Sequence, residues 1–159
     1  MTLLYLDASA WVKRYFQEDG SGWVNQQFEQ ESLMAASTLG LIEVAATCAR
    51  KRAAGVQDAG RDSRIEIDLL EDWEGLFQMD LTVETLDRSL EVARTYALRG
   101  ADCVHLASAL ILKEQLAVEA SEFALVTSDQ ELKAAALKLG LHVVDPIEED
   151  RKAFAPPAP

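Results

Sequence analysis

The segment FALVTSDQELKAAALKLGLHVV, residues 123–144, decides the fold class of this chain. It opens with an apolar run, which predicts a buried strand over 123–127. A helical pattern follows over 129–139, Gly140 can end that helix, and 141–144 is typical of another strand. A strand, a helix and a strand in direct succession predict two parallel strands joined by a crossover helix.

The same alternation extends from this segment back to the start of the chain. Short apolar runs beside turn residues or a charged residue predict further strands over 3–6, 33–36 and 80–83. Helical periodicity lies between them, over about 10–16, 23–31, 38–54, 58–77, 84–99 and 102–116. The sequence therefore predicts an α/β protein in which helices cover both faces of a parallel sheet.

The length and composition indicate one ordinary domain. The 159 residues are 49% hydrophobic, and we expect one domain over 1–147 with a polar, proline-rich tail over 148–159, disordered over 155–159. No apolar run reaches the ~20 residues of a membrane helix, and the first residues do not resemble a secretory signal. Cys48 and Cys103 have no metal-binding spacing, which fits a protein of the reducing cytoplasm.

Four of the 27 acidic residues occupy apolar surroundings, whereas most of the others lie in polar stretches. Asp7 is the only charged residue among the first twelve. Glu43 and Asp102 are each the only acid in a long apolar helical stretch, and Asp129 closely follows the predicted strand 123–127. Because burying a lone carboxylate is costly, each of these acids needs a partner.

Each acid also has a purely structural explanation. Asp7 and Asp102 can be helix N-caps, and Asp129 lies in a possible capping box where it would complement the helix dipole. Glu43 is in the middle of a predicted helix, where no cap is needed, so a buried ion pair with an arginine such as Arg14 is its best structural alternative.

Considered together, the four acids predict a metal site. Asp7 and Asp129 follow two strands, and open parallel sheets place their ligand crevice at the carboxyl ends of strands. Carboxylates that converge repel one another and raise their own pKa values unless a cation is present. Oxygen ligands suit Mg²⁺ or Mn²⁺, and no histidine or cysteine cluster indicates zinc. We therefore expect Asp7, Glu43, Asp102 and Asp129 to hold Mg²⁺ or Mn²⁺.

The net charge of −12 opposes binding to nucleic acid, so any such function requires local cations. Arg14 follows Asp7 by seven residues, and Arg50 follows Glu43 by seven. Seven residues are about two helical turns, so each arginine is expected on the face of its acid. Arg14, Arg50 and Lys51 are therefore candidate contacts to phosphate, although all three can equally be ordinary surface residues.

Four stretches carry the acids, namely LLYLDASAWVKRYF at 3–16, STLGLIEVAATCAR at 37–50, LRGADCVHLASALI at 98–111 and ALVTSDQELKAAALKLGLHVV at 124–144. In their order and approximate spacing they resemble the PIN-domain family, and within it the VapC-like toxin ribonucleases of type II toxin–antitoxin systems. The resemblance covers nearly the whole chain, and each stretch has its acid in place.

The resemblance implies a three-layer α/β/α sandwich with a five-stranded parallel sheet. It also implies a cytoplasmic, Mg²⁺- or Mn²⁺-dependent endoribonuclease that cuts RNA, is restrained by a cognate antitoxin protein and forms a homodimer. By position it assigns Asp7, Glu43, Asp102 and Asp129 to catalysis and metal binding, with the hydroxyls of Ser9 and Thr127 supporting them.

Two other functions compete with this interpretation. A haloacid-dehalogenase-like phosphatase also begins with an apolar strand and an aspartate, but it requires a second aspartate where this chain has Ser9. A catalytically silent PIN-like scaffold that binds proteins stays open. His105 shares a helical face with Asp102 and could therefore touch the site, but we interpret it first as a histidine of the core.

Overall fold

A computed structural model of the chain describes residues 2–55, 64–117 and 119–153. Its centre is a sheet of five strands in the order β3-β2-β1-β4-β5, and every neighbouring pair is parallel. The strands are β1 (Leu3–Leu6), β2 (Met34–Ser37), β3 (Phe77–Met79), β4 (Phe123–Val126) and β5 (Val143–Val144). The expected five-stranded parallel sheet is thus confirmed.

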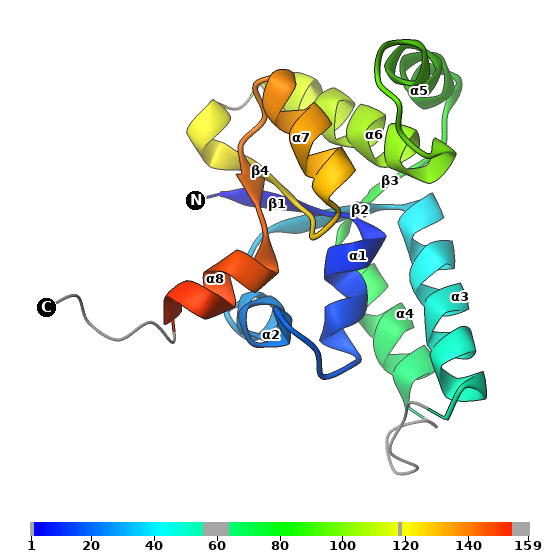
Figure 1. The fold of residues 1–159 in the computed structure, drawn as a ribbon, viewed down its shortest axis with the longest axis vertical. Helices are drawn as coiled ribbons and strands as arrows, with labels where there is room; N and C mark the ends of the chain where they lie inside the picture. Colours follow the sequence, from blue (N-terminus) through cyan, green and yellow to red (C-terminus); the bar gives the residue numbers. More distant parts are fainter. Residues whose placement is uncertain (1, 56–63, 118, 154–159) are drawn as a thin grey trace, which may run out of the picture.

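Helices cover both faces of this sheet, which confirms the three-layer architecture (Figure 1). One layer contains α1 (Ala8–Trp11), α2 (Ser21–Glu29), α3 (Thr38–Ala53), α4 (Ile65–Gly75) and α8 (Pro146–Ala153). The opposite layer contains α5 (Val83–Thr95), α6 (Gly100–Leu116) and α7 (Gln130–Lys138). Short 3-10 helices at Val12–Arg14 and Ala120–Glu122 complete the described elements. No helix among the described residues is long and apolar enough to cross a membrane.

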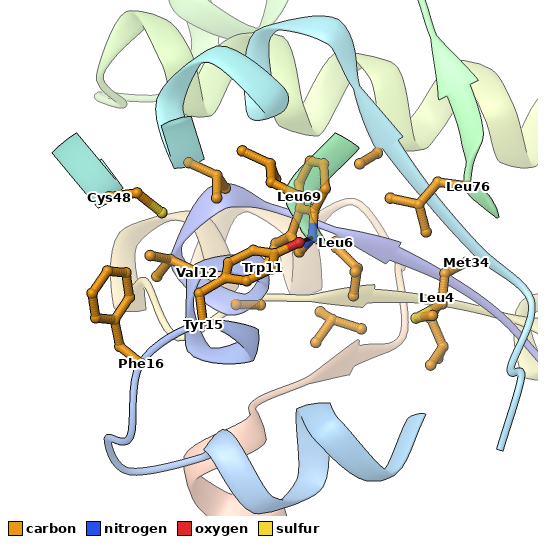
Figure 2. Close-up of a cluster of buried hydrophobic side chains, with 14 of the residues drawn as sticks. Leu4, Leu6, Trp11, Val12, Tyr15, Phe16, Met34, Cys48, Leu69 and Leu76 are labelled. Atoms are coloured by element: carbon orange, nitrogen blue, oxygen red, sulfur yellow. Dashed lines mark hydrogen bonds between the residues drawn. The ribbon is translucent and has the colours of Figure 1, made fainter. Parts of the chain in front are cut away.

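The central strand β1 supplies side chains to both hydrophobic cores. Leu4 and Leu6 pack in the cluster that includes Trp11 of α1, which Figure 2 shows. Leu3 and Tyr5 point to the opposite face and pack with residues of α6 and α7. Because successive side chains of a strand alternate between faces, a strand covered on both sides must be apolar at every position. This explains the unbroken run LLYL before Asp7.

The third strand was placed wrongly by the sequence, which predicted it over 80–83. Strand β3 is Phe77–Met79, and Thr82 instead caps α5 by accepting a hydrogen bond from the backbone N–H of Thr85. The edge strand β3 is partly exposed to solvent, and Phe77 is half-exposed. Because only a strand covered on both faces must be apolar at every position, β3 lacks the apolar run that identifies a central strand. The predicted start of the preceding helix at 58 lies outside the described residues.

Residues 146–153, which include the start of the expected polar tail, form α8, which packs against α2. The carboxylate of Asp150 accepts hydrogen bonds from the backbone N–H groups of Gly22 (3.2 Å) and Trp23 (2.7 Å). It therefore caps the N-terminus of α2, where the N-cap residue Gly20 offers no side chain. The expected disorder over 155–159 concerns residues outside the described part of the chain.

We predict that Asp150→Ala lowers the free energy of unfolding by about 1 kcal/mol, because two N–H groups of α2 lose their acceptor. Urea denaturation of the full chain measures this change. The matched control is Glu149→Ala, which removes only a surface pair with Lys152. Equal stability of Asp150→Ala and the control would contradict the capping role.

Candidate functional site

Asp7 lies directly after the central strand β1 and is buried, with 2% of its surface exposed. Its carboxylate accepts hydrogen bonds from the backbone N–H of Ala10 (2.9 Å), from Ser9 Oγ (2.9 Å to each oxygen) and from Thr127 Oγ1 (2.8 Å). The N-cap role considered for Asp7 is therefore real. Burial nevertheless raises the pKa of Asp7, while the charge of His105 and these hydrogen bonds oppose the rise.

The hydroxyls of Ser9 and Thr127 join the ends of the adjacent strands β1 and β4. Thr127 Oγ1 donates to Asp7 and accepts from the backbone N–H of Asp129 at 3.0 Å. Ser9 Oγ accepts from the backbone N–H of Ser128 at 3.0 Å. Both hydroxyls thus fix the position of the Asp7 carboxylate, and a contribution of either to function stays a prediction.

Asp129 has two roles that its two oxygens divide between them. As the N-cap of α7, its Oδ1 accepts from the backbone N–H groups of Glu131 (3.0 Å) and Leu132 (2.9 Å). Its Oδ2 accepts from Arg99 Nη2 at 2.8 Å. The structural alternative considered for Asp129, a capping box in which it only complements the helix dipole, is therefore not what forms, because Asp129 is itself the N-cap and its second oxygen faces a cation.

Asp102 lies in the first turn of α6 and is 5% exposed. It is not the N-cap, a position that Arg99 occupies, and its Oδ2 accepts from Arg99 Nε at 2.8 Å. Arg99 thereby bridges Asp102 and Asp129, and these two carboxylates raise the pKa of its guanidinium. Arg99 was not among the site residues predicted from the sequence, although its position three residues before Asp102 indicates that the two side chains can meet.

Glu43 pairs with a histidine and not with the arginine that we considered. The Glu43 Oε2 and His105 Nε2 atoms lie 2.6 Å apart, and His105 Nδ1 shares a hydrogen bond with the Tyr5 hydroxyl at 3.2 Å. His105 is buried as expected, but it also contacts the candidate site. A Cβ at Gly40 would lie 3.1 Å from His105 Cε1, so the glycine lets α3 approach the ring.

The structure connects three of the four acids through intermediaries and not directly, whereas the side chain of Glu43 bonds only His105 among the residues described. Asp7 reaches Asp129 through Thr127, and Asp129 reaches Asp102 through Arg99. Asp7 and Asp102 are buried as expected, whereas the side chains of Glu43 and Asp129 are 32% and 22% exposed. Within the described residues, no three His, Cys, Asp or Glu side chains are arranged to hold a metal ion.

The donor chemistry of the site nevertheless fits a hard divalent cation. The available ligand atoms are carboxylate oxygens, the type that Mg²⁺ and Mn²⁺ prefer. The arginine between Asp102 and Asp129 shows that positive charge is stabilised at that position. Asp7, whose pKa is raised by burial, would gain most from a nearby cation.

The three basic residues expected beside the acids have other partners. Arg14 bonds Asp72 and Asn25. Helix α1 changes to a 3-10 helix at residue 12, so Arg14 does not lie on the face of Asp7 as a continuous α-helix would place it. It lines a hollow of about 480 Å³, which none of the four acids lines. Lys51 pairs with Glu18, and Arg50 bonds Thr47 at the exposed end of α3. Contact of these residues with RNA stays a prediction.

The fold and the acids at the carboxyl edge of its sheet define an α/β protein with a candidate cation-binding site. A model of the PIN domain matches residues 4–138, and the chain belongs to this family. Proteins named ribonuclease VapC45 (Mycobacterium tuberculosis strain CDC 1551 / Oshkosh) and ribonuclease VapC49 (M. tuberculosis strain ATCC 25618 / H37Rv) are each 37% identical over 114 residues, covering 69% of this chain and 76% of theirs.

Solved structures share the fold at lower sequence identity. The protein PAE2754 from Pyrobaculum aerophilum has a TM-score of 0.61 and 20% identity, over 96% of both chains. A chain of a toxin–antitoxin complex from Klebsiella pneumoniae has a TM-score of 0.58 and 16% identity, over 92% of this chain and 98% of that chain. These similarities establish the fold.

We predict that Asp7→Asn stabilises the metal-free protein at pH 7. The raised pKa means that the folded state holds the Asp7 proton more tightly than the unfolded state does. The wild type therefore loses stability as the pH rises above the ordinary value of 3.8, and the neutral asparagine does not.

Denaturation in the presence of a chelator, repeated from pH 3 to pH 8, measures this difference. The difference in free energy of unfolding between Asp7→Asn and wild type should become smaller toward acid pH. Asp87→Asn, on the exposed face of α5, is the matched control. A wild type that is more stable than Asp7→Asn at every pH would contradict the expected cost of the Asp7 charge.

Proposed function

We propose that this chain is a Mg²⁺- or Mn²⁺-dependent endoribonuclease and the toxin of a toxin–antitoxin pair. The observation that carries the proposal is the linked set of Asp7, Asp129 and Asp102 at one edge of the sheet. Membership of the PIN family and two relatives named VapC ribonucleases support it. The haloacid-dehalogenase alternative is excluded, because Ser9 replaces its second aspartate and serves Asp7 as a hydrogen-bond donor.

In this proposal Asp7, Asp102 and Asp129 hold the cation, and Glu43 is a further ligand or orients the attacking water. When bound, the cation lowers the pKa of a coordinated water and stabilises charge that develops on the phosphate. Ser9 and Thr127 keep the Asp7 carboxylate in one orientation through their hydroxyls. His105 holds the Glu43 carboxylate in place through the hydrogen bond at its Nε2 atom.

A protein partner and a cytoplasmic location belong to the same proposal. The net charge of −12 suits a basic segment of an antitoxin, and a complex of that kind should weaken as salt rises. The Klebsiella pneumoniae neighbour is a chain of a toxin–antitoxin complex, which supports such a partner. The buried, unpaired Cys48 and Cys103 fit a reducing compartment, and a homodimer is the expected resting assembly.

A catalytically silent protein-binding scaffold is the second candidate. It is favoured by the pairing of three acids with Arg99 and His105, which leaves no metal-holding group of three among the residues the structure describes. The two candidates differ in manganese dependence, because a scaffold has no use for the ion.

The cleavage test compares wild type, Asp7→Asn and Asp87→Asn on structured RNAs with manganese. Changes around a metal ligand typically cost 10- to 100-fold, so loss of the ligand Asp7 should lower the rate roughly 100-fold or more. Asp87→Asn should cleave like wild type. Full activity of Asp7→Asn would reject the catalytic assignment, and the absence of cleavage by any form would favour the scaffold.

The toxin role is tested by growth of a bacterial host. Induction of the wild-type chain should arrest growth, and co-expression of a small neighbouring gene that encodes a DNA-binding protein should restore it. Asp7→Asn should be harmless at equal protein level, because the arrest requires cleavage. Normal growth under wild-type induction without the neighbouring gene would remove the toxin role.

A further inference from the structure

The arginine at position 99 lies between two of the four acids of the site. Its Nε and Nη2 atoms donate to Asp102 and Asp129 at 2.8 Å each, across two different helix N-termini. Within the described residues, Arg99 is the one lysine or arginine that contacts any of the four acids. A planar guanidinium can contact two carboxylates at once, which an ammonium group does less well.

The surroundings of Arg99 differ sharply from those of its partners. The Arg99 side chain is 70% exposed, whereas Asp102 is almost fully buried. Arg99 precedes α6 at the N-cap position in extended backbone, so its side chain is free of packing within the helix. Ion pairs between exposed side chains contribute only about 0–1 kcal/mol each, and the solvent contact of Arg99 makes its pair with the partly exposed Asp129 the easier of the two to open.

We propose that Arg99 is a displaceable counter-ion, which neutralises Asp102 and Asp129 without metal and turns to an RNA phosphate when the divalent cation takes its place. This inference rests on the proposed function, since it assumes a metal-dependent ribonuclease. It assigns to the chain a phosphate-binding residue directly at the acids, where Arg14, Arg50 and Lys51 make no contact with them.

The competing role for Arg99 is a permanent structural clamp. In that case the arginine would stay on Asp102 with metal bound, and its removal would leave a buried carboxylate without a partner. A clamp predicts lower stability and no gain in metal affinity. A displaceable counter-ion predicts that metal binds more tightly once its competitor is gone, because the two cations cannot both hold the same oxygens.

The experiment uses the full chain as wild type, Arg99→Met, Arg99→Lys and Arg94→Met. Arg99→Met removes the charge but keeps a long apolar side chain, and Arg99→Lys keeps the charge without the fork. Arg94→Met is the matched control, since Arg94 is exposed near the end of α5 and forms no ion pair with described residues. Calorimetric titration with MnCl₂ gives the Kd, and cleavage at saturating manganese gives KM and kcat.

Arg99→Met should bind Mn²⁺ roughly two- to fivefold more tightly than wild type, the effect expected for losing a competitor worth up to about 1 kcal/mol. Its KM for RNA should rise, because the phosphate loses a contact, and Arg99→Lys should lie between the two. The Arg94→Met control should match wild type in both measurements.

Each other outcome is decisive. Unchanged or weaker Mn²⁺ binding by Arg99→Met would reject the role of Arg99 as a displaceable counter-ion, even if the wild type is an active ribonuclease. Tighter metal binding with an unchanged KM would overturn the contact to phosphate. If the wild type itself binds no manganese, the proposed function fails and this inference fails with it.

Discussion

The burial of one carboxylate, that of Asp7, is the constraint on which the site depends. The strand before it is covered on both faces, so Asp7 is almost fully buried where it leaves the sheet. Neutral donors alone do not offset that loss of solvation, because the pKa of Asp7 is raised despite its bonds from Ser9, Thr127 and Ala10. A cation bound near Asp7 would offset the cost of burying its charge, which fits the proposed metal site.

The parallel sheet determines how acids far apart in the chain come to share one edge. Strands β1 and β4 pair from Leu3 with Phe123 to Leu6 with Val126, so the residues after both strands begin at the same level. Thr127 can therefore reach Asp7, and the helix that starts at Asp129 begins beside it. The register of one strand pair, set within the apolar runs, thus places polar groups that lie outside it.

Isolation in apolar sequence correctly predicted the burial of Asp7 and Asp102, because a lone acid among apolar residues reports the cost of burying charge, and the central strands followed from the same logic. Glu43 and Asp129 are partly exposed, and a role of the four acids in metal binding stays a prediction. Features of the structure that are only partly buried escaped this criterion. The edge strand β3 lacks an unbroken apolar run, and Arg99 lies in the connection between α5 and α6, where an exposed arginine is common. His105 was correctly expected in the core, but its bond to Glu43 joins residues 62 positions apart, a relation that periodicity within one helix cannot reveal.

The acidic balance of the chain opposes RNA less than its net charge of −12 suggests. At physiological salt, charges more than about 8–10 Å apart are largely screened, so a phosphate at the site responds to the groups immediately around it. Those groups are carboxylates with Arg99 among them, and a divalent cation adds two positive charges at the same place. In the proposed function, a bound cation would therefore make the local field less negative, and the released guanidinium of Arg99 would add a contact to phosphate.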